Sequence, residues 1–285
     1  MFFKKFFLMM YIQKIIELLD FFWSEKKFLK LSSYPGVKGA VTSNPELLFF
    51  ILKNSLQVPN IYLVDRAIRV MDGGFLKKSM RLIQHHQFEV IIGNSKLIKE
   101  FKYLFEKSLE KIGVNKKEFF IEYLDDNWKQ VSIGAKGYGY EVQCNGVEIV
   151  QLTFFSSIAG CNFSVPPMEI TYGIERIALI LQQKDNIFDL MWNETITYGE
   201  LFFEREKHIY QALKLKFFSL EKELEYLNIL IKRKLAFAAL CQINYIAFIL
   251  DVLFIQKKIS KMVVQQYAIL LSKNASKVYE TIKIL

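Results

Sequence analysis

The last third of this chain has a composition that helices accommodate and turns do not. From Tyr198 to Leu285 there is no proline, and no glycine follows Gly199. Proline and glycine interrupt helices and form tight turns, so a long stretch without them predicts a helical tail. We therefore expect a domain boundary near residue 200, with an all-α C-terminal domain over residues 201–285.

The first 200 residues contain short runs rich in β-branched and aromatic side chains. These runs are 60–64, 87–92, 119–124, 138–144 and 147–155. Asn145-Gly146 separates the last two and is the strongest short signal for a hairpin turn. Met71–Gly74 breaks the chain between the first two, which predicts a wide hairpin with a long loop. With amphipathic helices expected over 12–23 and 95–112, the predicted fold is α+β, an antiparallel sheet core flanked by helices.

One segment joins a strand, a sharp turn and an arginine at the start of a helix. The β-type residues Ile170–Tyr172 precede Gly173, which permits an abrupt turn. Arg176 then opens an apolar helical run. Backbone N–H groups and the helix dipole favour an anion in a first turn, and a guanidinium binds phosphate through two parallel bonds. The segment predicts binding of a nucleotide triphosphate.

Charge and cysteine usage restrict the class of protein. The chain has 38 Lys and Arg against 29 Asp and Glu, a net charge of +9. This balance favours anionic partners such as nucleic acid, and a solvated lysine face explains it equally well. The cysteines Cys144, Cys161 and Cys241 lack metal or redox spacing and indicate a reducing compartment. Three scattered histidines predict no zinc site.

Two apolar segments resemble membrane signals. Met1–Ile12 has two lysines before a short apolar run, but no small-residue cleavage site follows, which favours an N-terminal helix. Leu235–Ile255 is long enough to span a bilayer. Asp251 within it would be costly in lipid, so we expect a buried helix and no membrane association.

Several runs keep the order and spacing of a family pattern from about residue 12 to residue 200. Gly39–Pro45 resembles GAGTSHP, Asn145–Thr153 resembles NGMEVTQFT, and Glu169–Arg176 resembles GEITYGLER. The further matching runs are Asp72–Gly74, Arg81-Leu82, Gln87–Val90, Asp126–Trp128 and Gly139–Val142. Together they resemble the α subunit of the bacterial heterotetrameric glycyl-tRNA synthetase, a class II aminoacyl-tRNA synthetase.

This resemblance implies an ATP-dependent glycine–tRNA ligase. Glycine's carboxylate would attack the α-phosphate of ATP, and the adenylate would then acylate tRNA(Gly). Such a reaction needs positioning and charge neutralisation rather than a protein nucleophile, and the chain has no Ser–His or Cys–His arrangement. The implied cofactors are ATP, as substrate, and Mg²⁺.

The resemblance assigns five residues to ATP. Arg69 would hold the α-phosphate, with Arg66 as a rival and a surface arginine as the alternative. Arg176 would hold the γ-phosphate, unless it only pairs with Glu175. The other candidates are Phe88 on adenine, Glu148 as a magnesium-linked carboxylate, and Gln151 beside it. The alternatives are a core aromatic for Phe88 and an exposed strand residue for Glu148.

Glycine has no side chain that the protein could bind. The pocket must therefore select glycine by having bulky residues that exclude larger amino acids sterically. An acid would pair with the substrate's ammonium group. The candidates in matching runs, each equally compatible with a structural role, are Gln87, Trp128, Glu141, Glu169 and Thr171.

The chain departs from the family pattern in the motif 2 loop. Gly74 stands for an arginine, and Leu76-Lys77-Lys78-Ser79 replaces a glycine-and-Asn-Pro sequence. Lys77 and Lys78 would compensate partly as point charges. Glu89 stands for a glutamine, Asn44 for a histidine and Lys136 for a tryptophan.

The resemblance also implies partners. They are a β subunit, tRNA(Gly) and a second α chain within an α2β2 tetramer, in the cytoplasm. The altered loop leaves one alternative open, a non-catalytic synthetase-like protein that binds a nucleotide or amino acid for regulation. Joint retention of Arg69, Phe88, Glu148 and Arg176 favours the enzyme.

Overall fold

The structure is a computed structural model that describes residues 10–34, 37–75 and 81–284. Its helices are α2 (Ile12–Glu25), α3 (Pro45–Lys53), α4 (Ser95–Lys99), α5 (Phe101–Lys111), α6 (Ile174–Gln182), α7 (Tyr198–Leu215), α8 (Leu220–Lys232), α9 (Ala236–Ile255) and α10 (Lys261–Ile282). Its strands are β1 (Leu29–Lys30), β2 (Val37–Lys38), β3 (Ile61–Ile68), β4 (Gln84–Ile92), β5 (Ile121–Asp126), β6 (Lys129–Gln130), β7 (Ala135–Cys144), β8 (Val147–Ile158), β9 (Cys161–Asn162) and β10 (Met168–Gly173). Short 3₁₀ turns are η1 (Val41–Ser43), η2 (Val70–Phe75), η3 (Val131–Ile133) and η4 (Ile187–Asp189).

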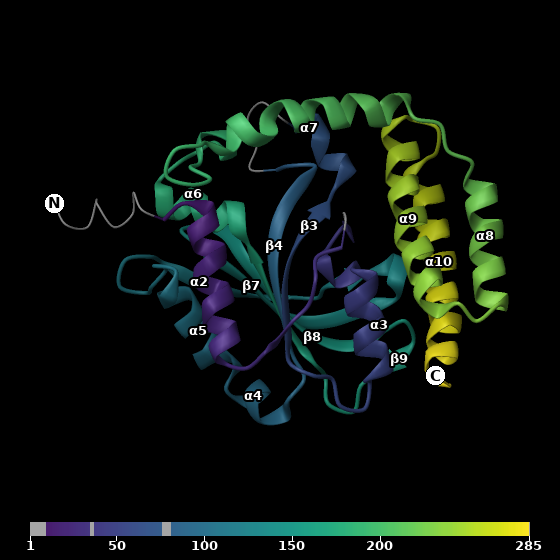
Figure 1. The fold of residues 1–285 in the computed structure, drawn as a ribbon, viewed down its shortest axis with the longest axis horizontal. Coiled ribbons are helices and arrows are strands. Elements are labelled where there is room, and N and C mark those ends of the chain that lie inside the picture. The colour runs from purple at the N-terminus through teal and green to yellow at the C-terminus, as the bar shows by residue number, and fades with distance from the viewer. Residues whose placement is uncertain (1–9, 35–36, 76–80, 285) are drawn as a thin grey trace.

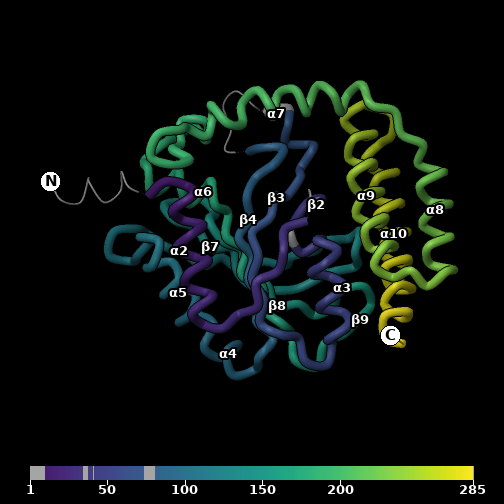
Figure 2. The backbone as a smooth tube through the Cα atoms, viewed as in Figure 1, coloured from purple at the N-terminus to yellow at the C-terminus, as the bar shows by residue number. Residues whose placement is uncertain are grey.

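The strands form one sheet with the order β1-β3-β4-β10-β8-β7-β5 (Figures 1 and 2). All pairings are antiparallel except those of β1 and β2 with β3. Asn145 and Gly146 have φ of 51° and 80° and join β7 to β8, as an Asn-Gly hairpin turn requires. The predicted α+β class and the hairpin are confirmed.

The two faces of the sheet bury different helices, because successive side chains of a strand point to opposite sides. Phe88 and Val90 of β4 face a core shared with α2, α5 and α6. Ile91 of β4 faces a second core shared with α3, α9 and α10. On this second face, the core covers β4 only near Ile91. The polar residues His85 and Gln87, nearer the start of β4, are not covered by it and line a pocket.

Four helices, α7 to α10, follow residue 197, as the composition predicted. In Figure 1, α7 lies across the end of the sheet and leads to a bundle of α8, α9 and α10. Leu240 and Ile243 of α9 share the second core with Leu47 of α3 and Phe155 of β8. The helical C-terminal region therefore packs on the sheet; the domain boundary near residue 200 stays a prediction.

Helix α9 corresponds to the apolar segment that was predicted to be a buried helix. Among the described residues it is the one helix long and apolar enough to cross a membrane. However, 67% of its most apolar window is buried inside the protein, as in the core helix of a globular protein. Asp251 lies 3.5 Å from the Lys38 ammonium. The ion pair and the burial support the buried-helix interpretation.

Two N-terminal expectations have different outcomes. The helix predicted over 12–23 is present as α2. Residues 1–9 of the predicted N-terminal helix lie outside the described residues.

The single helix predicted over 95–112 is wrong, because the Glu100 N–H bonds to the Leu97 carbonyl and ends α4 before α5 begins. No residue of α4 is fully buried, although Leu97 and Ile98 pack against the first core.

Candidate active site

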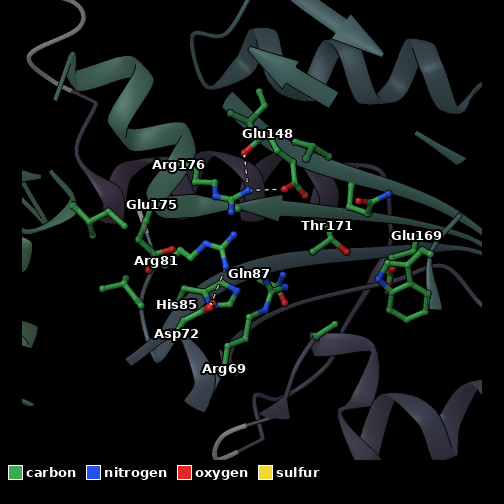
Figure 3. A pocket seen from close by; sticks show the side chains of 18 residues that line it. Arg69, Asp72, Arg81, His85, Gln87, Glu148, Glu169, Thr171, Glu175 and Arg176 are labelled. Carbon is green, nitrogen blue, oxygen red and sulfur yellow. Dashed lines mark hydrogen bonds and ion pairs between the residues drawn. The ribbon is translucent and has the colours of Figure 1, made fainter. Parts of the chain in front are cut away.

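A pocket lies on the open part of the sheet, beside the start of α6 (Figure 3). It brings together residues from distant parts of the chain. The predicted site residues that line it are Arg69, Gln87, Trp128, Glu148, Gln151, Glu169, Thr171 and Arg176. The other lining residues, which the sequence did not predict as site residues, are Ala40, Asp72, Arg81, Leu82, His85, Ile149, Val150, Gly173, Glu175 and Ile187.

Strand alternation explains which β-sheet residues reach the pocket. Gln87 lines it from β4, and Glu169 and Thr171 line it from the adjacent β10. Thr171 is the register partner of Glu89 on β4 and of Gln151 on β8. Paired residues of neighbouring strands share a face, so Thr171 and Gln151 lie side by side on the pocket floor.

One end of the pocket is cationic. Arg69 follows β3 and donates from Nε to the Gly39 carbonyl at 3.0 Å. Arg81 lies 3.3 Å from Asp72. Burial lowers the pKa of Arg69; Asp72 opposes this shift, and the nearby charge of Arg176 adds to it. Several guanidinium groups converge here, so an anion bound between them would relieve their repulsion.

Arg176 occupies the first turn of α6, as the sequence predicted. Gly173 provides no side-chain cap for this helix. The Arg176 Nη1 atom lies 2.6 Å from a carboxylate oxygen of Glu148 and 3.2 Å from the Glu148 carbonyl. The alternative pairing of Arg176 with Glu175 is wrong, because Glu175 bonds elsewhere. Arg66, the rival of Arg69, does not line the pocket.

The opposite part of the pocket is acidic and buried. Glu169 is 1% exposed and accepts a 2.6 Å hydrogen bond from the Thr42 hydroxyl. Beside it lies Glu89, which is 0% exposed and whose carboxyl interacts with that of Glu169. Burial raises the pKa of both carboxyls, and the charge of Glu169 raises that of Glu89 further. Glu89 therefore holds a proton that it can donate to Glu169, which keeps the charge.

His85 lies close to the arginines and lines the pocket from β4. Burial and the charge of Arg69 lower its pKa from 6.5 to about 3. The imidazole is therefore neutral at physiological pH and adds no charge to the cationic end. His85 lies between the matching runs Arg81-Leu82 and Gln87–Val90, so the resemblance gave no reason to assign it a role.

Two further predicted residues frame the pocket. Trp128 packs edge-to-face on Phe155, with ring centroids 5.7 Å apart. Gln151 donates from Nε2 to Asp126 at 3.1 Å and to the Tyr140 carbonyl at 3.3 Å. These contacts hold both side chains in place, as a binding site requires.

The structure does not bring Phe88 to the pocket. Its side chain is 0% exposed on the other face of the sheet, stacked on Tyr62 with centroids 5.7 Å apart and edge-on to Tyr172. Because Gln87 faces the pocket, the next residue of the strand must face away. The predicted stacking of Phe88 on adenine in this pocket is therefore wrong, and the core-aromatic alternative applies.

Glu141 also lies outside the pocket lining. It is the register partner of Gln151 and so shares the pocket face, one strand farther out on β7. Its carboxylate accepts a 2.7 Å hydrogen bond from Gln143. The prediction that Glu141 lines the glycine pocket is wrong because one strand spacing separates it from the pocket floor.

The altered motif 2 loop is only partly described. Leu76, Lys77, Lys78 and Ser79 lie outside the described residues. Gly74 lies in η2, after Asp72. Among the described residues, no three His, Cys, Asp or Glu side chains cluster closely enough to hold a metal ion.

A hydrogen-bonded cluster around Glu175 supports the start of α6. Glu175 is 2% exposed and accepts hydrogen bonds from the His86 N–H at 2.9 Å, from His86 Nδ1 at 2.7 Å and from the Tyr198 hydroxyl at 3.0 Å. Burial alone would raise the pKa of Glu175, but the interactions with His86 outweigh burial and lower it. This cluster ties α6 to β4 and α7, next to Arg176.

Replacing Glu175 by glutamine should lower the free energy of unfolding at pH 7 by about 1–3 kcal/mol. The lowered pKa means that ionised Glu175 stabilises the fold above about pH 4.5 and that this contribution is lost as the pH falls. Urea unfolding from pH 7 down to pH 3 should therefore show a steady gap in unfolding free energy above about pH 5 and a gap that closes below it. The exposed Glu194→Gln is the control, and a gap that stays constant with pH would contradict the assignment.

The chain is similar to known proteins over most of its length. A family model described as glycyl-tRNA synthetase alpha subunit matches residues 12–283. Among solved structures, the chain is similar to pyrrolysyl-tRNA synthetase from Desulfitobacterium hafniense, with 11% identity, 66% of this chain and 75% of that chain covered, and a TM-score of 0.45. A second structure of that enzyme, named PylSc, has 12% identity, covers 65% of this chain and 72% of that chain, and has a TM-score of 0.43.

Proposed function

Because this chain belongs to the glycyl-tRNA synthetase alpha subunit family, we propose that its pocket binds ATP at the arginine end and glycine at the acidic end. The chain is an aminoacyl-tRNA ligase of class II, the catalytic alpha subunit of a glycine–tRNA ligase. The observation that carries the proposal is the pocket's polarity, with arginines at one end and a buried carboxylate at the other.

At the arginine end, Arg69 binds the α-phosphate and Arg176 the γ-phosphate. The pentavalent transition state gathers negative charge on the α-phosphate, so a guanidinium held in place by the Gly39 carbonyl stabilises it more than the ground state. Arg176 adds the N-terminus of α6, whose free N–H groups favour phosphate. Arg81, beside Asp72, is a further phosphate contact in this proposal.

At the acidic end, the Glu169 carboxylate pairs with the ammonium of glycine. Thr42 and the protonated Glu89 orient it. Trp128, Gln87 and Thr171 line the same pocket, and in this proposal they surround the glycine Cα and exclude larger side chains. Selection therefore works by steric exclusion, because one added methylene meets the pocket wall.

Magnesium fits this site as a companion of ATP. Mg²⁺ is usually bound by one or two carboxylates and the substrate's phosphates. Glu148 is a carboxylate at the arginine end, where it pairs with Arg176. Glu148 would hold the ion, which neutralises phosphate charge when bound, and Gln151 lies on the same strand.

The remaining parts of the function concern the assembly. An alpha subunit of this family implies a beta subunit and a tRNA. We propose that the chain dimerises within an α2β2 tetramer, acts on tRNA(Gly) and works in the cytoplasm. The regulatory alternative is weakened because both arginines line the pocket together with the buried acid.

Glycine-dependent ATP–pyrophosphate exchange tests the proposal. The chain mixed with its beta subunit should exchange label with glycine and not with alanine or serine, because the pocket excludes side chains. The same assay without the beta subunit measures what the alpha subunit does alone. Folded protein without exchange under both conditions would refute the proposed site.

A further inference from the structure

Helix α7 carries three residues, spaced i, i+4 and i+7, that all face the connection between β3 and β4. These are Glu206, Tyr210 and Leu213. Such spacing places side chains on one face of a helix. The connection has two described arms, the first arm (residues 69–75) and the second arm (residues 81–83), and both contribute to the pocket lining.

Glu206 binds the second arm through its carboxylate. It is 0% exposed, and its Oε2 accepts from the Ile83 N–H at 2.7 Å. The Gln84 N–H donates to Oε1 at 3.3 Å. A buried carboxylate on two consecutive backbone amides is a strong, directional contact, because charge-assisted hydrogen bonds are about twice as strong as neutral ones.

The same contact reaches Arg69 through one further hydrogen bond. The Arg69 N–H donates to the Ile83 carbonyl at 2.7 Å. The backbone of Ile83 therefore bonds to Glu206 through its N–H and to Arg69 through its carbonyl. A shift of Ile83 moves the backbone from which the Arg69 guanidinium extends into the pocket.

The other two residues of the stripe hold the first arm. A Cβ placed on Gly73 would lie 2.4 Å from Tyr210 Cδ2, so α7 contacts the backbone there directly. Leu213 packs with Val70 and with Val252 of α9 in one apolar cluster. Both arms are thus fastened to a single helix that crosses the end of the sheet (Figure 1).

We infer that Glu206 is a positioning residue that sets the place of Arg69 at the ATP end of the pocket. The inference rests on the proposed role of Arg69 and extends it to a residue outside the pocket. Glu169 lies on β10 and does not depend on the two arms. Loss of Glu206 should therefore affect ATP and leave glycine binding unchanged.

The test compares Glu206→Gln and Glu206→Ala with Glu204→Gln, an exposed glutamate of the same helix. The glutamine keeps the shape and one acceptor but presents an NH2 group to a backbone N–H. In exchange assays with the beta subunit, the KM for ATP should rise on the order of tenfold, with the KM for glycine and the Glu204→Gln control unchanged.

Amide hydrogen exchange gives a readout that is independent of activity. Peptides covering Ile83 and Gln84 should exchange faster in folded Glu206→Gln than in the wild type. Unchanged amide exchange, or KM values for ATP and glycine that rise together, would overturn the inference. A wild-type protein without pyrophosphate exchange would instead refute the proposed function, and the amide data would still decide whether Glu206 holds the arm.

Discussion

Replacing Arg176 by alanine is expected to lower glycine-dependent ATP–pyrophosphate exchange by about 10²–10³-fold, while the fold remains intact. Arg176 lies in the first turn of α6, at the arginine end of the pocket, with its guanidinium held 2.6 Å from Glu148. Removing it takes away a bidentate donor and a charge from the site where the triphosphate binds. Its side chain is partly exposed, so its loss leaves no cavity in the core.

Two comparisons make this result specific. Arg176→Lys keeps a charge but loses the planar fork, so it should retain activity between that of alanine and wild type. Arg233→Ala removes an exposed arginine at the end of α8 and should change nothing. Circular dichroism and thermal melting report whether each variant folds. A folded Arg176→Ala protein with exchange near the wild-type rate would show that the γ-phosphate binds elsewhere.

Replacing Glu169 by glutamine should raise the KM for glycine about a hundredfold. The carboxylate is 1% exposed and is the proposed partner of the substrate's ammonium, so an amide leaves that charge unpaired in a desolvated site. The KM for ATP should change little, because Arg69 and Arg176 lie at the other end of the pocket. Steady-state exchange with each substrate varied in turn separates the two effects.

Glu89→Gln is the control for Glu169→Gln, because Glu89 lies on β4, the strand next to β10. Its amide replaces the shared proton as a donor to Glu169, so the KM for glycine at pH 7 should stay near the wild-type value. Burial raises the pKa of Glu89 well above 4.5, so the folded state binds a proton that the unfolded state releases, and the wild type loses stability as pH rises above that value. Glu89→Gln should therefore unfold at higher urea, with a gap that widens from pH 5 to pH 8. A gap that narrows would mean that Glu89 is ionised in the folded protein.

The sequence predicted those features that depend on local chemistry. A hairpin at Asn145-Gly146 follows from the positive φ that this pair tolerates. The helix that begins after Gly173 places Arg176 in its first turn. The tail without proline or glycine forms helices. Each of these is set by a few neighbouring residues, so no distant partner was needed to predict it.

The side of a strand that faces a pocket was harder to predict. Gln87 and Phe88 are adjacent in the same matching run, yet only Gln87 lines the pocket. β4 is central in the sheet and is covered on both faces, so its sequence has no clear alternation of apolar and polar residues. The assignment of Glu141 to the pocket was wrong for a related reason. The sequence does not show that β7 lies one strand beyond the pocket floor.

The sequence by itself determined the family pattern, the α+β class and the residue types that can bind ATP and glycine. Only the tertiary structure decided which of them meet in one pocket, that Arg176 pairs with Glu148 rather than Glu175, and that Glu206 of a distant helix holds the arm beside Arg69. Glu89 and Glu206 carry no local signal, since an isolated glutamate in sequence gives no sign of burial. Their roles arise from desolvation and from long-range hydrogen bonds, which exist only once strands and helices far apart in the chain have packed together.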